Sequence, residues 1–359
     1  MPEELDLFNR GNQAYYQERF KEAIEYYDRA LMIDPVFKDA LFNKATILSQ
    51  TNQNEHAVEV FDQFLELYPE EKTALNSKAF ALNQLDKFSD AINCYDRSLR
   101  IDPKDVEALI GKAMAFNDLN RYNEAIESYD KALAIDRNNK CALNGKGIAL
   151  GNLNKPEEAL VYYDKALQID PDYKMALINK GTTLDGLNKS DEALHYFDRA
   201  IDIDPEDIEA IYNKGFALSN LKNYEEAIKY YDRALKIDPK FKLALNNKSY
   251  ALKNLKRYEE AIEYSDRALS VDPTFTYALD SKGIALAELK RYDEALMYLN
   301  RALSVDPNFV EALNNKGYVY YKLKRFDEAL ELYEKLLKID PNFKPAQLMK
   351  VALNRLINM

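Results

Sequence analysis

The stretch of this sequence that comes closest to a chemical site is the glycine-rich segment Gly145–Gly151, which reads Gly-Lys-Gly-Ile-Ala-Leu-Gly. Glycines around a lysine are typical of loops that wrap a phosphate group, but such a loop follows a strand and opens a helix. Here the segment lies inside a predicted helix, in register with the segment at residues 179–181. The pattern therefore favours small residues that pack within a helix over a phosphate-binding loop.

Metal-binding and catalytic side chains are few and scattered. His56 and His195 lie far apart without a neighbouring set of ligands, and Cys94 and Cys141 show no ligand spacing. The serines and threonines have no recognisable partners for a catalytic triad, and acidic stretches such as residues 224–226 suit the first turn of a helix. We therefore predict a protein that is not an enzyme and holds no metal or cofactor.

A basic residue recurs at a fixed interval along the chain and could form a stripe for nucleic acid. The series comprises Arg10, Lys44, Lys78, Lys112, Lys146, Lys180, Lys214, Lys248, Lys282 and Lys316. An acidic series has the same period, and an antiparallel helix pair would place each acidic residue beside a basic residue. We therefore favour exposed ion pairs, worth ~0.2–1 kcal/mol each, over a nucleic-acid stripe. The predicted pairs are Asp28–Lys44, Asp62–Lys78, Asp96–Lys112, Asp130–Lys146, Asp164–Lys180, Asp198–Lys214, Asp232–Lys248 and Asp266–Lys282.

Asparagine recurs one position before the basic series. It occurs at Asn9, Asn43, Asn179, Asn213, Asn247 and Asn315, and is interrupted by Ser77, Gly111, Gly145 and Ser281. Asparagine is an ordinary helix former at best, so its recurrence inside helices indicates a role. One interpretation is a hydrogen bond between repeats or a solvated face. The other is a ladder of amides that donate to and accept from the backbone of an extended peptide.

These residues recur because the whole chain has one period, equal to the interval from Pro35 to Pro69. Proline marks it at Pro35, Pro69, Pro103, Pro171, Pro205, Pro239, Pro273, Pro307 and Pro341, and alanine at Ala23, Ala57, Ala91, Ala125, Ala159, Ala193, Ala227, Ala261, Ala295 and Ala329. A strict period of this length indicates a solenoid whose repeats pack on their neighbours. The predicted repeats are residues 4–37, 38–71, 72–105, 106–139, 140–173, 174–207, 208–241, 242–275, 276–309 and 310–343.

Each repeat is predicted to form two antiparallel helices, as residues 208–241 illustrate. The first helix carries an apolar stripe at Ile211, Gly215, Leu218 and Leu221, and the second at Ala227, Tyr231, Ala234 and Leu235. Pro239 ends the second helix, because proline disfavours helix in the residue before it. Residues 344–359 are predicted to form a C-terminal capping helix that turns Ala346, Met349, Leu353 and Leu356 towards the last repeat.

The small, bulky and turn residues of residues 208–241 resemble the signature of the tetratricopeptide repeat. The signature residues are Gly215, Ala227, Tyr231, Ala234 and Pro239. The resemblance implies an all-α right-handed superhelix of ten helix pairs plus the capping helix, with the first helices lining a concave groove. It also implies a non-catalytic scaffold that binds a protein or peptide. The residues expected to contact the peptide are Asn9, Asn12, Asn43, Asn179, Asn213, Asn247, Asn315, Tyr212, Phe216, Tyr250, Tyr318 and Tyr321.

The formal charge of the chain is −11, with a pI of about 5.0, which disfavours nucleic acid and anionic membranes as partners. The groove positions are also mostly acidic, so a neutral or basic partner is favoured over an acidic one. No apolar stretch approaches the ~20 residues of a membrane span, and the first residues lack the apolar core of a secretory signal. We therefore expect a cytoplasmic monomer that binds an extended protein segment. The alternative is a structural protein that self-associates.

Overall fold

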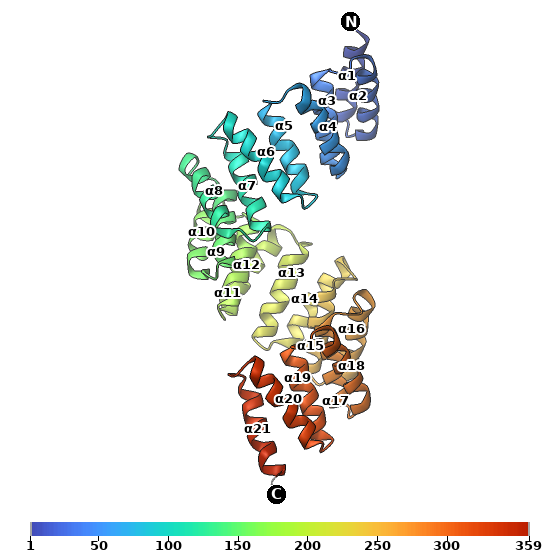
Figure 1. The fold of residues 1–359 in the computed structure, drawn as a ribbon, viewed down its shortest axis with the longest axis vertical. Coiled ribbons are helices and arrows are strands. Elements are labelled where there is room, and N and C mark those ends of the chain that lie inside the picture. The colour runs from blue at the N-terminus through green and yellow to red at the C-terminus, as the bar shows by residue number, and fades with distance from the viewer. Residues whose placement is uncertain (1, 358–359) are drawn as a thin grey trace. The chain divides into compact units, whose positions relative to one another are not determined.

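The structure, a computed structural model, describes residues 2–357 and consists of helices joined by short turns, without a strand in that part of the chain (Figure 1). The predicted all-α class is confirmed. The end of the predicted capping segment, residues 358–359, lies outside the described residues. The helices form two blocks that divide after Asn179, called here the N-terminal and the C-terminal block.

The N-terminal block contains α1 (Glu3–Tyr16), α2 (Phe20–Ile33), α3 (Lys38–Gln50), α4 (Asn54–Leu67), α5 (Lys72–Asn83), α6 (Phe88–Ile101), α7 (Val106–Asp118), α8 (Tyr122–Ile135), α9 (Lys140–Asn152), α10 (Pro156–Ile169) and the start of α11 (Lys174–Gly186). The C-terminal block contains the rest of α11, α12 (Ser190–Ile203), α13 (Ile208–Asn220), α14 (Tyr224–Ile237), α15 (Lys242–Asn254), α16 (Tyr258–Val271), α17 (Thr276–Glu288), α18 (Tyr292–Val305), α19 (Val310–Lys322), α20 (Phe326–Ile339) and α21 (Lys344–Ile357).

Consecutive helices pack against each other from α1 to α10 in the N-terminal block and from α12 to α21 in the C-terminal block. The odd-numbered helices α1–α19 are called first helices and the even-numbered ones second helices. Neighbouring first helices also contact each other, for example α5 with α7 and α15 with α17. The alanine that recurs at one position of the second helices is fully buried in all ten of them. A larger side chain there would hold the helices apart, which explains why alanine recurs.

The turns on both sides of each second helix are built by recurring polar residues. A residue with a left-handed backbone lies just after each first helix, such as Lys222 with φ of 62° after α13, and closes the helix end. After nine of the ten second helices, an aspartate precedes the proline position, and Tyr68 takes its place in the other. In one such turn, the N–H of Lys240 donates to Asp238 Oδ1 at 2.8 Å. These turns fix the direction of every following helix.

Seven of the eight predicted ion pairs between neighbouring repeats are confirmed. Lys44 Nζ lies 2.5 Å from Asp28 Oδ1, and Lys112 Nζ lies 2.6 Å from Asp96 Oδ1. The other five pairs are Asp62–Lys78, Asp130–Lys146, Asp198–Lys214, Asp232–Lys248 and Asp266–Lys282. The remaining pair, Asp164–Lys180, takes one residue from each block and stays a prediction.

The prediction that these pairs are exposed is wrong for several of the lysines. The Lys248 side chain is only 7% exposed, whereas its partner Asp232 is 45% exposed. Lys248 Nζ lies 3.9 Å from the ring centroid of Tyr264, a residue of the following second helix. The amine is thus held between a carboxylate and an aromatic face, an arrangement worth more than an exposed ion pair.

The last helix, α21, packs as predicted at Ala346 and Leu353, which are fully buried. Leu356 was predicted to join them, but it is 41% exposed. At about 100° per residue it lies about 80° around the helix axis from Ala346. Leu348 and Val351, which are 71% and 53% exposed, also make the outer face of this helix more apolar than predicted.

Candidate functional site

One position of the first helices is exposed in five repeats and half-buried in the other five. It is occupied by Asn12, Thr46, Phe80, Met114 and Ile148 in the N-terminal block, and by Thr182, Phe216, Tyr250, Ile284 and Tyr318 in the C-terminal block. We call the surface around these positions the first-helix face. Phe80 is 53% exposed and Met114 52%, while Phe216 is 41% and Tyr250 43% exposed. Neighbouring exposed apolar side chains of this size are typical of a binding surface.

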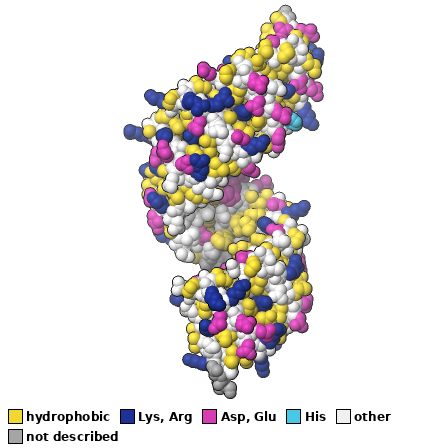
Figure 2. Space-filling model, in the orientation of Figure 1, with side chains coloured by type: hydrophobic (Ala, Val, Ile, Leu, Met, Phe, Trp, Pro, Cys, Tyr) yellow, Lys and Arg dark blue, Asp and Glu magenta, His cyan; other side chains and the backbone are white. Residues whose placement is uncertain are grey.

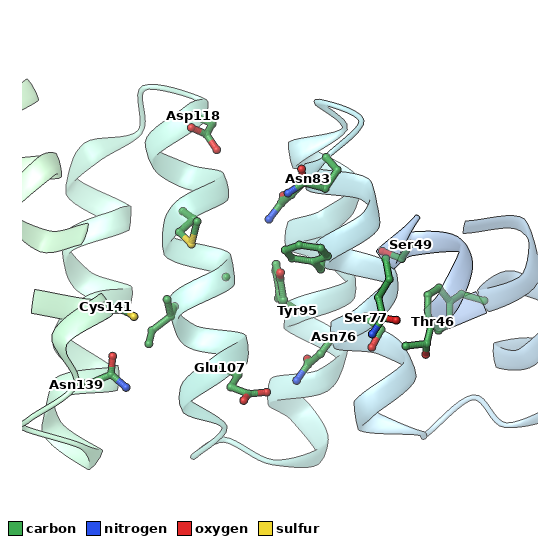
Figure 3. A pocket seen from close by; sticks show the side chains of 17 residues that line it. Thr46, Ser49, Asn76, Ser77, Asn83, Tyr95, Glu107, Asp118, Asn139 and Cys141 are labelled. Atoms are coloured by element: carbon green, nitrogen blue, oxygen red, sulfur yellow. The ribbon is translucent and has the colours of Figure 1, made fainter. Parts of the chain in front are cut away.

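A cleft of about 670 Å³ lies on the first-helix face of the N-terminal block (Figure 3). Its walls come mostly from α3, α5, α7 and α9, and Phe80, Ile110 and Met114 form its apolar part. Polar side chains surround them, among them Asn76 and Asn83 of α5. The cleft is open and has room for a large side chain and part of a peptide backbone.

The cleft depends on where an aromatic ring of the second helices points. In five of the ten repeats the ring lies against a glycine of its own repeat: a Cβ added at Gly215 would lie 2.9 Å from Tyr231 Cε1. Tyr95 instead lies against Gly111 of the next repeat, where an added Cβ would be 2.4 Å from its Oη. Ala79 replaces the glycine of Tyr95's own repeat, and its methyl group fills the space that the ring takes elsewhere.

The next repeat has the same arrangement. Ala113 takes the place of the glycine, and Tyr129 lies against Gly145, where an added Cβ would be 2.4 Å from Tyr129 Oη. An asparagine at residue 111 or 145 would collide with the ring. The asparagine series is therefore interrupted at Gly111 and Gly145 because a tyrosine from the preceding repeat occupies that space.

The predicted asparagines of the N-terminal block bond to neighbouring side chains. Asn12 Oδ1 accepts from Tyr27 Oη at 2.7 Å and from Asn43 Nδ2 at 3.1 Å, and these residues line a small cavity of about 230 Å³. Asn179 Nδ2 donates to Asn144 Oδ1 at 3.0 Å. Asn9 is exposed on α1. The structure thus brings Asn12 and Asn43 together.

The asparagines of the C-terminal block behave in the same way. Nδ2 of Asn213 donates to Thr182 Oγ1 at 3.3 Å, and Nδ2 of Asn247 donates to Tyr212 Oη at 2.8 Å. Asn315 donates to both carboxylate oxygens of Asp280, at 2.8 and 3.0 Å. These amide nitrogens make the inter-repeat hydrogen bonds of the first interpretation. Contact of these side chains with a peptide stays a prediction.

The predicted aromatic residues of the C-terminal block differ in exposure. Tyr212 is half-buried, with its ring centroid 4.9 Å from that of Phe241, and burial raises its pKa to about 12. Phe216 and Tyr250 are exposed. A cavity of about 260 Å³ brings Tyr212, Asn213 and Phe216 together.

The two remaining tyrosines are tied to neighbouring side chains. Tyr318 donates from its hydroxyl to Glu288 Oε1 at 3.1 Å. The half-buried ring of Tyr321 lies 6.1 Å from that of Phe326. Tyr321 therefore belongs partly to the core, and Tyr318 remains on the first-helix face.

Charges on the first-helix face are mainly negative. Glu107 and Asp118 are the charged residues among those found to line the cleft, and Figure 3 shows them at the two ends of α7. Burial, followed by the neighbouring Asp86, raises the pKa of Asp118. In the C-terminal block, burial raises the pKa of Asp280 to about 6, against the lowering effects of Asn315 and Lys253. Elsewhere, Figure 2 shows basic and acidic side chains interspersed over the face in view.

The residues that sequence reasoning missed are Phe80, Asn76, Asn83 and Tyr95. Phe80 precedes Met114 by one repeat period and Phe216 by four, so the repeat register could have found it. Tyr95 has a sequence signal too, since alanine replaces the recurring glycine at residue 79 and glycine replaces the recurring asparagine at residue 111. The described residues contain no group of three or more potential metal ligands. Across residues 2–357, no helix has the length and apolarity to cross a membrane.

Sequence comparison finds repeats along most of the chain. A model described as tetratricopeptide repeat matches residues 6–37, 106–139, 141–173, 208–241 and 310–343. A second model of the same description matches residues 38–71, 73–105, 176–207 and 243–275, and a TPR repeat model matches residues 283–324. No curated protein matches the chain.

Solved structures of similar fold have low sequence identity. The APC/C hetero-tetramer Cut9–Hcn1 matches with a TM-score of 0.61 at 20% identity, over 97% of this chain and 75% of that chain. A tetratricopeptide repeat protein from Parabacteroides merdae gives 0.59 at 20% identity, over 69% and 98%. Yeast Tom70 gives 0.52 at 17%, over 99% and 88%. At these identities the likeness concerns the fold.

Proposed function

Because this chain belongs to the tetratricopeptide repeat family, we propose that it is a non-catalytic scaffold that binds an extended protein segment on the first-helix face. Phe80, Met114, Phe216 and Tyr250 contact the partner, because they offer large apolar area at little entropic cost. The asparagine series holds neighbouring first helices in register beside them.

The observation that carries this proposal is the exposure of large side chains at one repeated position. The same position is 53% exposed at Phe80 and 41% exposed at Phe216, so each block presents an apolar contact beside a cavity. The mainly acidic surroundings favour a neutral or basic partner over an acidic one.

A selection from a library of random 12-residue peptides displayed on phage, with the full chain immobilised, tests the proposal. We expect selected peptides to lose at least tenfold in affinity for the double variant Phe80→Ala/Met114→Ala or for Phe216→Ala/Tyr250→Ala. The control is Lys21→Ala, a change on exposed surface of a second helix. Selected peptides that bind a folded variant with all four alanines as tightly as the wild type would refute the proposal.

Self-association is the second candidate, favoured by the exposed Leu348 and Val351 on α21. This helix carries basic residues and no acidic ones, whereas the first turn of α1 carries Glu3, Glu4 and Asp6. The charges suit a head-to-tail contact between two copies. Sedimentation velocity over a hundredfold range of concentration tests it: a species that stays monomeric contradicts self-association, and an oligomer lost in Leu348→Glu supports it.

A further inference from the structure

The cleft of the N-terminal block has features that specify its occupant beyond an extended protein segment. It combines a cavity of about 670 Å³ with the exposed side chains of Phe80 and Met114. We propose that it holds one large apolar side chain of a partner segment that carries a basic residue on each side. This inference rests on the proposed function and assigns the partner chemistry of one site.

The apolar part of the cleft lies between two acidic residues of one helix. Glu107, Ile110, Met114 and Asp118 follow one another at spacings of three, four and four residues, so they form one stripe on α7. Eleven residues of helix separate the two carboxylates, which corresponds to about 16 Å along the axis. About five residues of extended chain span that distance. Basic residues two positions before and after the apolar anchor can therefore reach both carboxylates.

The charge of the cleft excludes the opposite pattern. The residues found to line it include Glu107 and Asp118 and no basic side chain. An acidic segment would meet like charge at both ends, whereas lysine or arginine would gain two opposite charges. The raised pKa of Asp118 agrees with a carboxyl group that lacks a basic neighbour.

Unpaired polar atoms in the wall point to a peptide backbone next to the anchor. Nδ2 of Asn76 donates to Asp105 Oδ2 at 3.0 Å, while its Oδ1 is buried and has no hydrogen-bond partner. Oδ1 of Asn83, one helix turn beyond Phe80, is also buried and unpaired. Buried acceptors are normally paired. Small rotations of these amides would let both oxygens accept from N–H groups of a bound segment.

The reactivity of Cys141 can show whether the cleft is occupied. Cys141 lines the cleft and is exposed, whereas Cys94 is buried and burial raises its pKa. N-ethylmaleimide therefore reacts with Cys141 first, because the exposed thiolate is the nucleophile. A ligand in the cleft slows this alkylation, which mass spectrometry follows on the full chain.

The probe is a 12-residue glycine–serine peptide with one central tryptophan and a lysine two positions to each side. Matched peptides replace both lysines by glutamate or the tryptophan by serine. We expect the lysine peptide to protect Cys141 and to bind at least tenfold more tightly than either matched peptide. Glu107→Gln/Asp118→Asn should abolish the preference for lysine over glutamate. Phe80→Ala/Met114→Ala should weaken binding at least tenfold.

The control is Lys21→Ala, a change on the exposed surface of α2 and outside the cleft, which should not affect binding. Phe80 and Met114 are more than half exposed, so their truncation leaves the core intact, and Met114→Lys gives a second test by repelling the lysine peptide. Binding that leaves the alkylation rate of Cys141 unchanged and weakens only in Phe216→Ala/Tyr250→Ala overturns the cleft assignment and leaves the proposed function standing. Equal affinity for the lysine and glutamate peptides, or binding of neither, overturns the inference as well.

Discussion

The direction of the Tyr95 ring can be tested by giving residue 111 the asparagine that most other repeats carry. In Gly111→Asn, the new Cβ would lie 2.4 Å from Tyr95 Oη and Cζ, far inside van der Waals contact. The ring must move, and overpacking of this kind costs ~1–3 kcal/mol. The control is Gly151→Asn, because an added Cβ at Gly151 meets no atom within 4 Å. For Gly151→Asn we expect the free energy of unfolding to rise by only about 0.3 kcal/mol, because asparagine is a slightly better helix former than glycine.

A second substitution should rescue the first. Ala79→Gly alone costs about 2 kcal/mol, from helix propensity and the lost methyl group. It also vacates the space that the ring takes against Gly215 in another repeat. The Tyr95 ring can then turn back and leave room for the asparagine side chain introduced at residue 111. We expect the double variant to be more stable than the sum of the two single changes by about 2 kcal/mol.

Urea unfolding followed by circular dichroism, fitted with a nearest-neighbour description of the repeats, measures these free energies. The wild type, both single variants and the double variant are compared, and Gly151→Asn is the control. Strictly additive costs would refute the coupling between residues 79 and 111. A Gly111→Asn single variant as stable as the wild type would refute the position of the ring itself.

The remaining predictions concern the ladder of lysines, one carboxylate and the asparagines. Lys248→Met should lower the free energy of unfolding by about 0.5–2 kcal/mol more than Lys78→Met, because an aromatic ring lies 3.9 Å from Lys248 Nζ; equal losses in urea unfolding would contradict this. Asp280 has a folded-state pKa of about 6, above its unfolded value, so it destabilises the fold above pH 6 and ceases to do so below pH 4. Asp280→Asn should therefore stabilise by about 1–3 kcal/mol at pH 7 and show little gain at pH 4, and the same gain at both pH values would be inconsistent with the raised pKa. Asn213→Ala with Asn247→Ala should cost about 2 kcal/mol, one for each inter-repeat hydrogen bond; unchanged stability with lost peptide binding would instead favour the amide ladder.

Features set by the repeat period could be predicted from the sequence. The ion pairs follow from the period, because the lysine and the aspartate of each pair both lie about two helix turns from the proline turn and therefore side by side in an antiparallel helix pair. Burial of Ala227 and the end of α14 before Pro239 follow in the same way. These features depend on helix geometry and turn chemistry, which act over a few residues.

Features set by differences between repeats were harder to predict. The near-burial of Lys248 depends on a tyrosine in the following second helix, and the cleft depends on the direction of the Tyr95 ring. That direction follows from a methyl group at residue 79, where other repeats have glycine, and from the missing side chain at residue 111, where most repeats have asparagine. These are two small changes within a uniform pattern. Periodicity alone does not reveal how such a change redirects a neighbouring side chain.

A comparison of equivalent positions in the ten repeats indicates where we expect selectivity for a partner to arise. The recurring alanine of the second helices is fully buried in every repeat, so packing leaves it no freedom. The first-helix position that Phe80 and Phe216 share is occupied by asparagine, threonine, phenylalanine, methionine, isoleucine and tyrosine in different repeats. Packing does not require any one of these side chains there, since the same backbone accommodates all of them. If partners bind here as proposed, we expect differences in binding between repeats to arise at this position and at the small residues beside it.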